Sequence, residues 1–160
     1  MDHRVTLSVL LAVICAVAPA GSQPLHGRVR PRPKCTDAQP LEQRTELANV
    51  IVSGYVGKVM RKPRTLQYNC EVQIVRIFKG EETVHNGISP PMDPQTNQIM
   101  VTGFGDPAIC DNAAHVGDVK LLLLDRDRNG FLRLNSSLVR ITLGNLDMTN
   151  AFVKGKFLFC

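Results

Sequence analysis

Short apolar segments separated by turn residues dominate the middle of the chain. Pro90, Pro91 and Pro94 forbid a central strand around them, but a short strand is expected just before, near Thr83 to Ile88. The other predicted strands are rich in Val, Ile or Leu and are bounded by Gly, Pro or Asn: 49–60, 66–78, 99–104, 119–124 and 131–134. With one helix expected at 40–48 and another near the C-terminus, the pattern predicts a mainly β protein. We expect a five- to six-stranded antiparallel barrel flanked by an N-terminal and a C-terminal helix.

The first residues have the pattern of a secretory signal peptide. Arg4 precedes an apolar run from Val5 to Val17, and Ala18-Pro19-Ala20 is a small-x-small cleavage pattern. The run is about 13 residues long, which is shorter than the ~20 that a membrane-spanning helix needs. The sequence therefore predicts a signal peptide at 1–20, a secreted chain and no membrane span.

A basic segment follows at residues 21–34. It has too few apolar side chains to fold, so a disordered tail is expected. A solvated linker is the favoured interpretation, and heparan sulfate is the charged partner that such a tail could bind. Nucleic acid is not expected, because the chain has no Trp and few other aromatic residues for stacking. The cations of the tail are Arg28, Arg30, Arg32 and Lys34.

Four cysteines remain once Cys15 leaves with the signal peptide: Cys35, Cys70, Cys110 and Cys160. An even number in an oxidising compartment predicts two disulfides. A zinc site would need close pairs such as CxxC, which this chain lacks. No metal or other cofactor is therefore expected. Four cysteines allow three pairings, and their spacing does not choose among them.

Catalytic motifs are missing from the sequence. No nucleophile motif stands beside His26, His85 or His115, and HExxH does not occur. Asp106 and Asp111 lie in a Gly- and Pro-rich loop, where turn capping is the expected role. The sequence predicts a protein that is not an enzyme.

The segment from Asp125 to Gly130 matches the first half of a calcium-binding loop. The twelfth position of such a loop requires a bidentate Glu, but Ser136 stands there. Arg126 and Arg128 would also oppose a divalent cation. Because Asn129-Gly130 is typical of a hairpin turn, we predict a turn instead.

Residues 135–156, read as one helix, carry two apolar stripes. A helix on a small domain needs one wide stripe. The second stripe either packs under another part of the same domain or buries against a partner helix. Asn135-Ser136-Ser137 is an N-glycosylation sequon and also supplies residue types that cap helices. The stripe of interest contains Val139, Leu143, Leu146 and Val153, with Asn150 in the gap.

Several stretches together resemble the agrin N-terminal domain family of basement-membrane proteins. The resemblance covers residues from about Cys35 to Val153, and it assigns 35–160 to one such domain. The family is similar to netrin and metalloproteinase-inhibitor modules, which implies an OB-like barrel. The stretches are LANVIVSGYVGKV, QYNCEVQIVRIFKG, VTGFGDPAICDN, VGDVKLLLL and NSSLVRITLGNL.

The resemblance implies an extracellular glycoprotein module that binds the coiled coil of laminin, by its gamma chain, through the C-terminal helix. The family's two apolar contact residues fall on Leu146 and Val153, with Val139, Leu143 and Asn150 as expected flanking contacts. Attachment to basement membrane, and receptor clustering or synapse organisation, are the implied roles. A metalloproteinase-inhibitor-like module and a glycosaminoglycan-binding module are the alternatives.

The resemblance also implies a disulfide pairing. The family's link between its first cysteine and that of the ICDN stretch implies Cys35 with Cys110, and Cys70 with Cys160 would follow. Phe152 stands at about the place of the family's helix-end cysteine, and Cys160 lies eight residues later. A metalloproteinase inhibitor of the related kind acts through a free N-terminal cysteine, whereas about 14 residues precede Cys35 after signal cleavage.

Overall fold

The computed structural model describes Cys35 and residues 39–155. The predicted signal peptide, the basic tail and Cys160 lie outside these residues. The elements follow one another along the chain as helices α1 (Leu41–Leu47), α2 (Glu81–Asn86) and α3 (Leu143–Val153) and strands β1 (Val50–Arg61), β2 (Tyr68–Lys79), β3 (Gln98–Phe104), β4 (Val119–Arg126), β5 (Leu132–Leu134) and β6 (Val139–Arg140).

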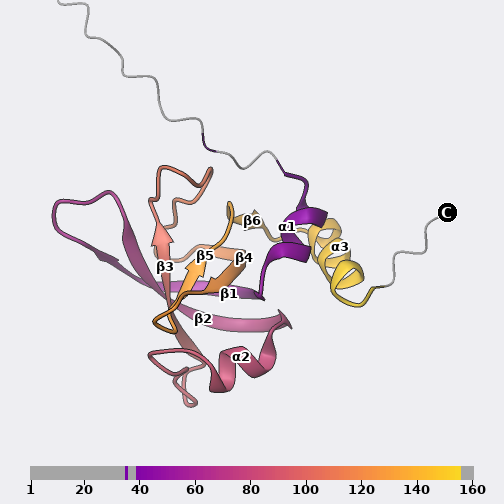
Figure 1. Ribbon diagram of the computed structural model, residues 1–160, viewed down its shortest axis with the longest axis horizontal. Helices are drawn as coiled ribbons and strands as arrows, with labels where there is room; N and C mark the ends of the chain where they lie inside the picture. Colours follow the sequence, from indigo (N-terminus) through magenta and orange to yellow (C-terminus); the bar gives the residue numbers. More distant parts are fainter. Residues whose placement is uncertain (1–34, 36–38, 156–160) are drawn as a thin grey trace, which may run out of the picture. The chain divides into compact units, whose positions relative to one another are not determined.

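Five of the strands close into a barrel (Figure 1). β1 pairs antiparallel with both β2 and β4, and β2 pairs antiparallel with β3. β5 pairs antiparallel with β4 but parallel with β3, where Val101 lies opposite Leu132. The prediction of a mainly β barrel flanked by helices is confirmed, and the parallel pair gives it the strand order β1-β2-β3-β5-β4.

The side chains of β4 are buried on both faces of the barrel wall. Successive side chains of a strand point to opposite faces. Leu122 and Leu124 therefore belong to the cluster inside the barrel, whereas Leu121 and Leu123 belong to a second cluster outside it. The prediction of a buried strand from this apolar run is confirmed. The outer cluster consists of Ala48, Ile51, Leu121, Leu123 and Val139, with Leu41, Phe78, Ile141 and Val153 packed against it.

The short strand expected near Thr83 to Ile88 is wrong, because this segment contains helix α2. Gly80 adopts φ 79°, and a Cβ there would lie 2.6 Å from the Asn49 carbonyl oxygen. Glu81 and Glu82 then occupy the first turn, where the helix dipole favours negative charge. Val side chains prefer strands, but Val84 is buried in the barrel core from this helix, and that burial stabilises the helical conformation.

The prediction of a single helix over 135–156 is also wrong, because the helix begins later than expected. Val139 and Arg140 form β6, which pairs with Lys120 and Leu121 of β4. α3 begins only after Thr142, whose hydroxyl oxygen accepts a hydrogen bond from the Asn145 N–H at 3.1 Å. Val139 is 6% exposed, so packing in the outer cluster holds it in an extended conformation. None of the helices within residues 39–155 is long and apolar enough to cross a membrane.

Candidate functional site

Helix α3 lies beside α1 and contacts β2 (Figure 1). Its buried side centres on Thr149, which is fully buried. Val153 packs against the outer cluster, and it also borders a groove of about 280 Å³ between the two helices. α3 is therefore fixed along one side only. The groove is lined by Glu42, Thr45, Glu46, Lys79, Phe152 and Val153.

The predicted contact residues within α3 share one edge of the helix. Leu146 and Val153 are both partly buried. Seven residues make almost two helical turns, which places these side chains about 10.5 Å apart along the axis. Asn150, also partly buried, lies between them, and Leu143 is 82% exposed one turn before Leu146. Val139 does not belong to this edge, because it lies on β6 and is buried.

Polar contacts accompany the apolar packing of α1 on β2 and on the C-terminal part of the chain. Nη1 of Arg44 donates to the Ser137 carbonyl oxygen at 3.1 Å and to its hydroxyl at 2.6 Å. Nζ of Lys79 donates to the carbonyl oxygens of Thr45 and Glu46. Sequence reasoning missed this junction, since its partners are far apart along the chain. Four buried polar atoms here have no hydrogen-bond partner among the described residues: Arg44 Nε and the hydroxyls of Thr45, Ser136 and Thr149.

Cys35 and Cys110 form a disulfide with their Cα atoms 5.1 Å apart. This is the pairing that the resemblance implies. Cys70, in contrast, is a free thiol inside the barrel, and its expected partner Cys160 lies outside the described residues. Its side chain packs in the interior cluster with Val72 and Val101, and this burial raises the pKa of the thiol to about 12.

The sequon lies outside helix α3. Asn135 follows β5 and precedes the actual cap, Thr142, by seven residues. The expectation that it supplies the helix cap is therefore wrong. Its Nδ2 donates to Asp125 Oδ2 at 2.5 Å, and its backbone N–H donates to the Leu123 carbonyl oxygen at 3.0 Å. Glycosylation of Asn135 stays a prediction.

The turn predicted from the calcium-like segment is confirmed. Oδ1 of Asp127 accepts hydrogen bonds from the backbone N–H groups of Asn129 and Phe131, both at 2.8 Å. These bonds tie the loop between β4 and β5. Residues 39–155 contain no group of three or more His, Cys, Asp or Glu side chains arranged to hold a metal ion.

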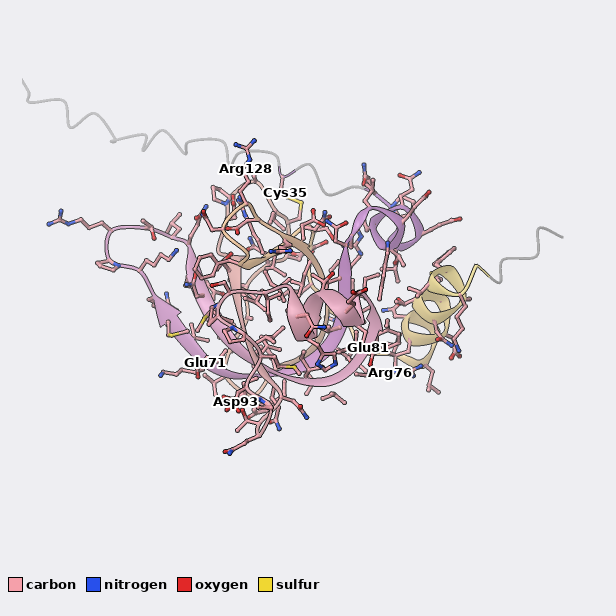
Figure 2. All side chains as sticks on the ribbon, turned by 60° about the horizontal axis from the view of Figure 1, so that its bottom comes forward. Cys35, Glu71, Arg76, Glu81, Asp93 and Arg128 are labelled. Atoms are coloured by element: carbon pink, nitrogen blue, oxygen red, sulfur yellow. A yellow bond between two sulfur atoms is a disulfide. The ribbon has the colours of Figure 1, made fainter. Side chains whose placement is uncertain are left out.

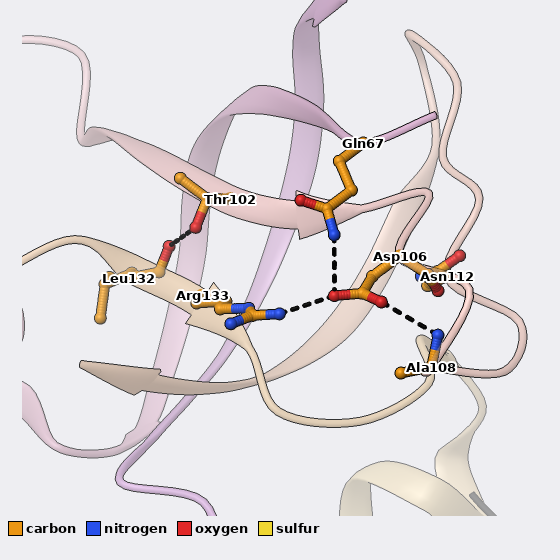
Figure 3. A network of polar contacts seen from close by, with 7 residues as sticks. All are labelled: Gln67, Thr102, Asp106, Ala108, Asn112, Leu132 and Arg133. Atoms are coloured by element: carbon orange, nitrogen blue, oxygen red, sulfur yellow. Dashed lines mark hydrogen bonds and ion pairs between the residues drawn. The ribbon is translucent and has the colours of Figure 1, made fainter. Parts of the chain in front are cut away.

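Asp106 caps its own turn, as predicted, by accepting from the Ala108 N–H at 2.9 Å. Figure 3 shows that its carboxylate also accepts from Gln67 and Arg133, at 3.1 and 2.6 Å. The sequence carries no signal for these partners, which come from β5 and from the segment before β2. The network joins the loop after β3 to β5 and to the segment before β2.

Two of the histidines weighed for catalysis lie at the surface, and the third, His26, lies outside the described residues. The side chains of His85 and His115 are exposed, and their ring nitrogens lie 3.9 Å from Glu81 and 3.8 Å from Asp118.

Similarity to known proteins extends over most of the chain. The family model described as the agrin NtA domain matches residues 42–156. The matched range includes all six strands and α3.

Proposed function

The chain belongs to the agrin NtA domain family, and from this premise we propose that it is a secreted module that binds laminin through helix α3. The family is one of laminin-binding extracellular modules rather than of enzymes. The partner surface that we propose is the coiled-coil region of laminin, contacted at its gamma chain.

The apolar edge of α3 is the observation that carries this proposal. Leu143 is largely exposed, and Leu146 and Val153 are only partly covered by the domain. A coiled coil repeats its side-chain pattern every seven residues. The seven-residue separation of Leu146 and Val153 matches that repeat, so both could contact equivalent positions on one partner helix.

The surroundings of Val153 suit an interface. Glu42 and Lys79 lie along the groove beside it, and they would supply a polar rim around the apolar contacts. Asn150 lies between Leu146 and Val153 and could donate or accept hydrogen bonds across the interface. The site is thus a short apolar stripe with polar neighbours.

Surface plasmon resonance on immobilised trimeric laminin tests the proposal. The test variants are Leu143→Ala, Leu146→Ala and the two combined. A central interface side chain contributes ~1–3 kcal/mol, which is roughly a 5- to 150-fold increase in Kd for each one. Met148→Ala is the matched control, because Met148 is 42% exposed on the opposite side of the same helix. Unchanged Kd for the combined variant would contradict the proposal.

Laminin binding would place the protein in basement membrane. We expect the secreted chain to co-distribute with laminin in matrix laid down by cultured cells, and the combined Leu143 and Leu146 variant to remain in the medium. Receptor clustering or synapse organisation is the further role that we propose. Counting receptor clusters on cultured muscle cells after addition of the purified chain tests it.

A further inference from the structure

The connection between β1 and β2 is an exposed loop that extends beyond the barrel. Arg61 ends β1 and Tyr68 begins β2, and these two residues lie opposite each other in the ladder. Residues 61–67 are all exposed, and Figure 1 shows the connection as a long loop beyond the paired strands. Exposed loop tips are the preferred sites of limited proteolysis.

Few hydrogen bonds hold this loop. Outside the strand ladders, no backbone–backbone hydrogen bond among the described residues involves residues 62–67. The side-chain bonds lie at the C-terminal end of the loop, where the Thr65 hydroxyl donates to the Gln67 carbonyl oxygen at 3.0 Å and Gln67 Nε2 donates to Asp106. Local opening around Arg64 therefore breaks few native contacts.

Arg64 adopts a backbone conformation that it can leave easily. Its φ is 65°, in the left-handed region. A protease cleaves its substrate as an extended strand, and extended backbone is the more favourable conformation for a residue with a Cβ. Extension of the loop in a protease site therefore does not cost a preferred backbone conformation at Arg64.

The structure distinguishes the Arg64–Thr65 bond from the other peptide bonds that follow a basic residue. Lys62 precedes Pro63, whose ring replaces the amide hydrogen and fixes φ, so the bond between them is a poor substrate. Lys154 ends α3, and the N–H groups of Lys154 and Gly155 are bonded to helix carbonyls. The described basic residues outside helices and strands are Lys62, Arg64, Arg128 and Lys154.

Arg128 is exposed like Arg64, and Figure 2 shows its side chain extending away from the ribbon. Its loop, however, is tied on both sides. The N–H of Asn129 donates to the Asp127 carboxylate at 2.8 Å, and the Asp127 N–H donates to the Phe131 carbonyl oxygen at 2.9 Å. Exposure without local freedom makes the bond after Arg128 a poorer substrate.

We propose that a trypsin-like serine protease cleaves the Arg64–Thr65 bond and leaves the domain folded as two chains. Such a protease binds an arginine side chain through a carboxylate in its primary pocket. Hydrolysis breaks the C–N bond between the two residues. The hydroxyl group of water bonds to the Arg64 carbonyl carbon, and the remaining proton goes to the Thr65 nitrogen.

The two chains stay together for two reasons. The first chain carries Cys35, α1 and β1, and the disulfide to Cys110 joins it to the second chain. β1 also remains paired with β2 and β4, and its Val50, Val52 and Val56 are buried inside the barrel. The cut therefore changes the connectivity of the barrel and not its fold.

Limited proteolysis of the purified full-length chain with trypsin, followed by mass spectrometry, tests the site. The first cut between Cys35 and Gly155 should give products that end at Arg64 and begin at Thr65. Arg64→Gln removes the cation that the protease pocket binds and should slow this cut at least about tenfold. The matched control is Arg128→Gln, which should leave the rate within about twofold of the wild type.

Three outcomes would overturn the proposal. The first is an unchanged rate for Arg64→Gln, and the second is a first cut at another bond of the described domain. The third is a cleavage rate that follows global unfolding as urea is added, because the cut would then need the unfolded chain.

Electrophoresis and circular dichroism test the two-chain form. The cleaved protein should migrate as one band without reductant and as two bands with it, and it should still unfold cooperatively in urea. Separation of the two chains without reductant, or loss of the cooperative transition, would contradict a two-chain barrel. These measurements need no laminin, so their outcome is independent of the proposed role of α3.

Discussion

Leu146 and Val153 lie on the same edge of helix α3, yet only Val153 packs against the outer apolar cluster. Leu146 belongs to neither of the buried clusters of the described residues. The two side chains that we propose as laminin contacts therefore have different surroundings in the free domain.

Substitution of these residues should separate stability from binding. Val153→Ala removes two half-buried methyl groups and should lower the free energy of unfolding by about 1 kcal/mol. Leu146→Ala should change it by less than about 0.5 kcal/mol. Urea unfolding followed by circular dichroism measures both. Both variants should bind laminin more weakly than the wild type. A larger stability loss for Leu146→Ala than for Val153→Ala would contradict the conclusion that only Val153 packs in the outer cluster.

Thr142 should determine how well α3 is formed. Its hydroxyl oxygen satisfies the Asn145 N–H at the start of the helix. Thr142→Ala should cost about 1 kcal/mol, and Thr142→Ser should restore most of it because Ser is an equally good cap. Thermal unfolding of the three proteins measures this difference. Equal melting temperatures would mean that packing against α1, and not the cap, holds the helix.

Cys70 predicts a pH dependence of stability. Burial raises the pKa of its thiol from 9.0 to about 12. Between these values the unfolded chain loses the proton while the folded chain keeps it, so the folded state binds more protons. The stability that depends on the protonated Cys70 thiol is therefore complete below pH 9 and decreases as the pH rises towards 12. We expect the wild type to lose stability relative to Cys70→Ala between pH 8.5 and about 10.5.

Urea unfolding at several pH values measures this difference. Subtracting the Cys70→Ala result removes the titration of the other groups and leaves the cavity cost as an offset that does not change with pH. If the difference in unfolding free energy between the two proteins stays constant with pH, the pKa of Cys70 is not raised by folding. The native thiol should also resist alkylation at pH 8 and react fully in urea, because only the thiolate is reactive.

The disulfide should contribute a large share of the stability. Cys35 and Cys110 are separated by 75 residues, and closing a loop of this length stabilises a fold by about 4 kcal/mol in the chain-entropy model. Cys35→Ser combined with Cys110→Ser should lower the free energy of unfolding by about that amount. Denaturant unfolding under non-reducing conditions measures it. An unchanged midpoint would show that the barrel does not need this link.

Much of the barrel could be predicted from local patterns. The apolar run in β4 and the hairpin residues Asn129-Gly130 specify their own conformations, because they depend on side-chain period and backbone preference. The family resemblance selected Leu146 and Val153. The polar partners of Asp106 could not be predicted, since Arg133 and Gln67 lie 27 and 39 residues away along the chain.

The sequence by itself determined the strand-rich core, the flanking helices and the family. The tertiary structure decided where α3 begins, why α2 is a helix and why Cys70 stays a free thiol. In each case a buried side chain prevails over local preference: Val139 is held in β6, Val84 anchors α2, and Cys70 faces the barrel interior. The physical reason is that local patterns restrict backbone angles, whereas burial depends on contacts made only after the barrel closes.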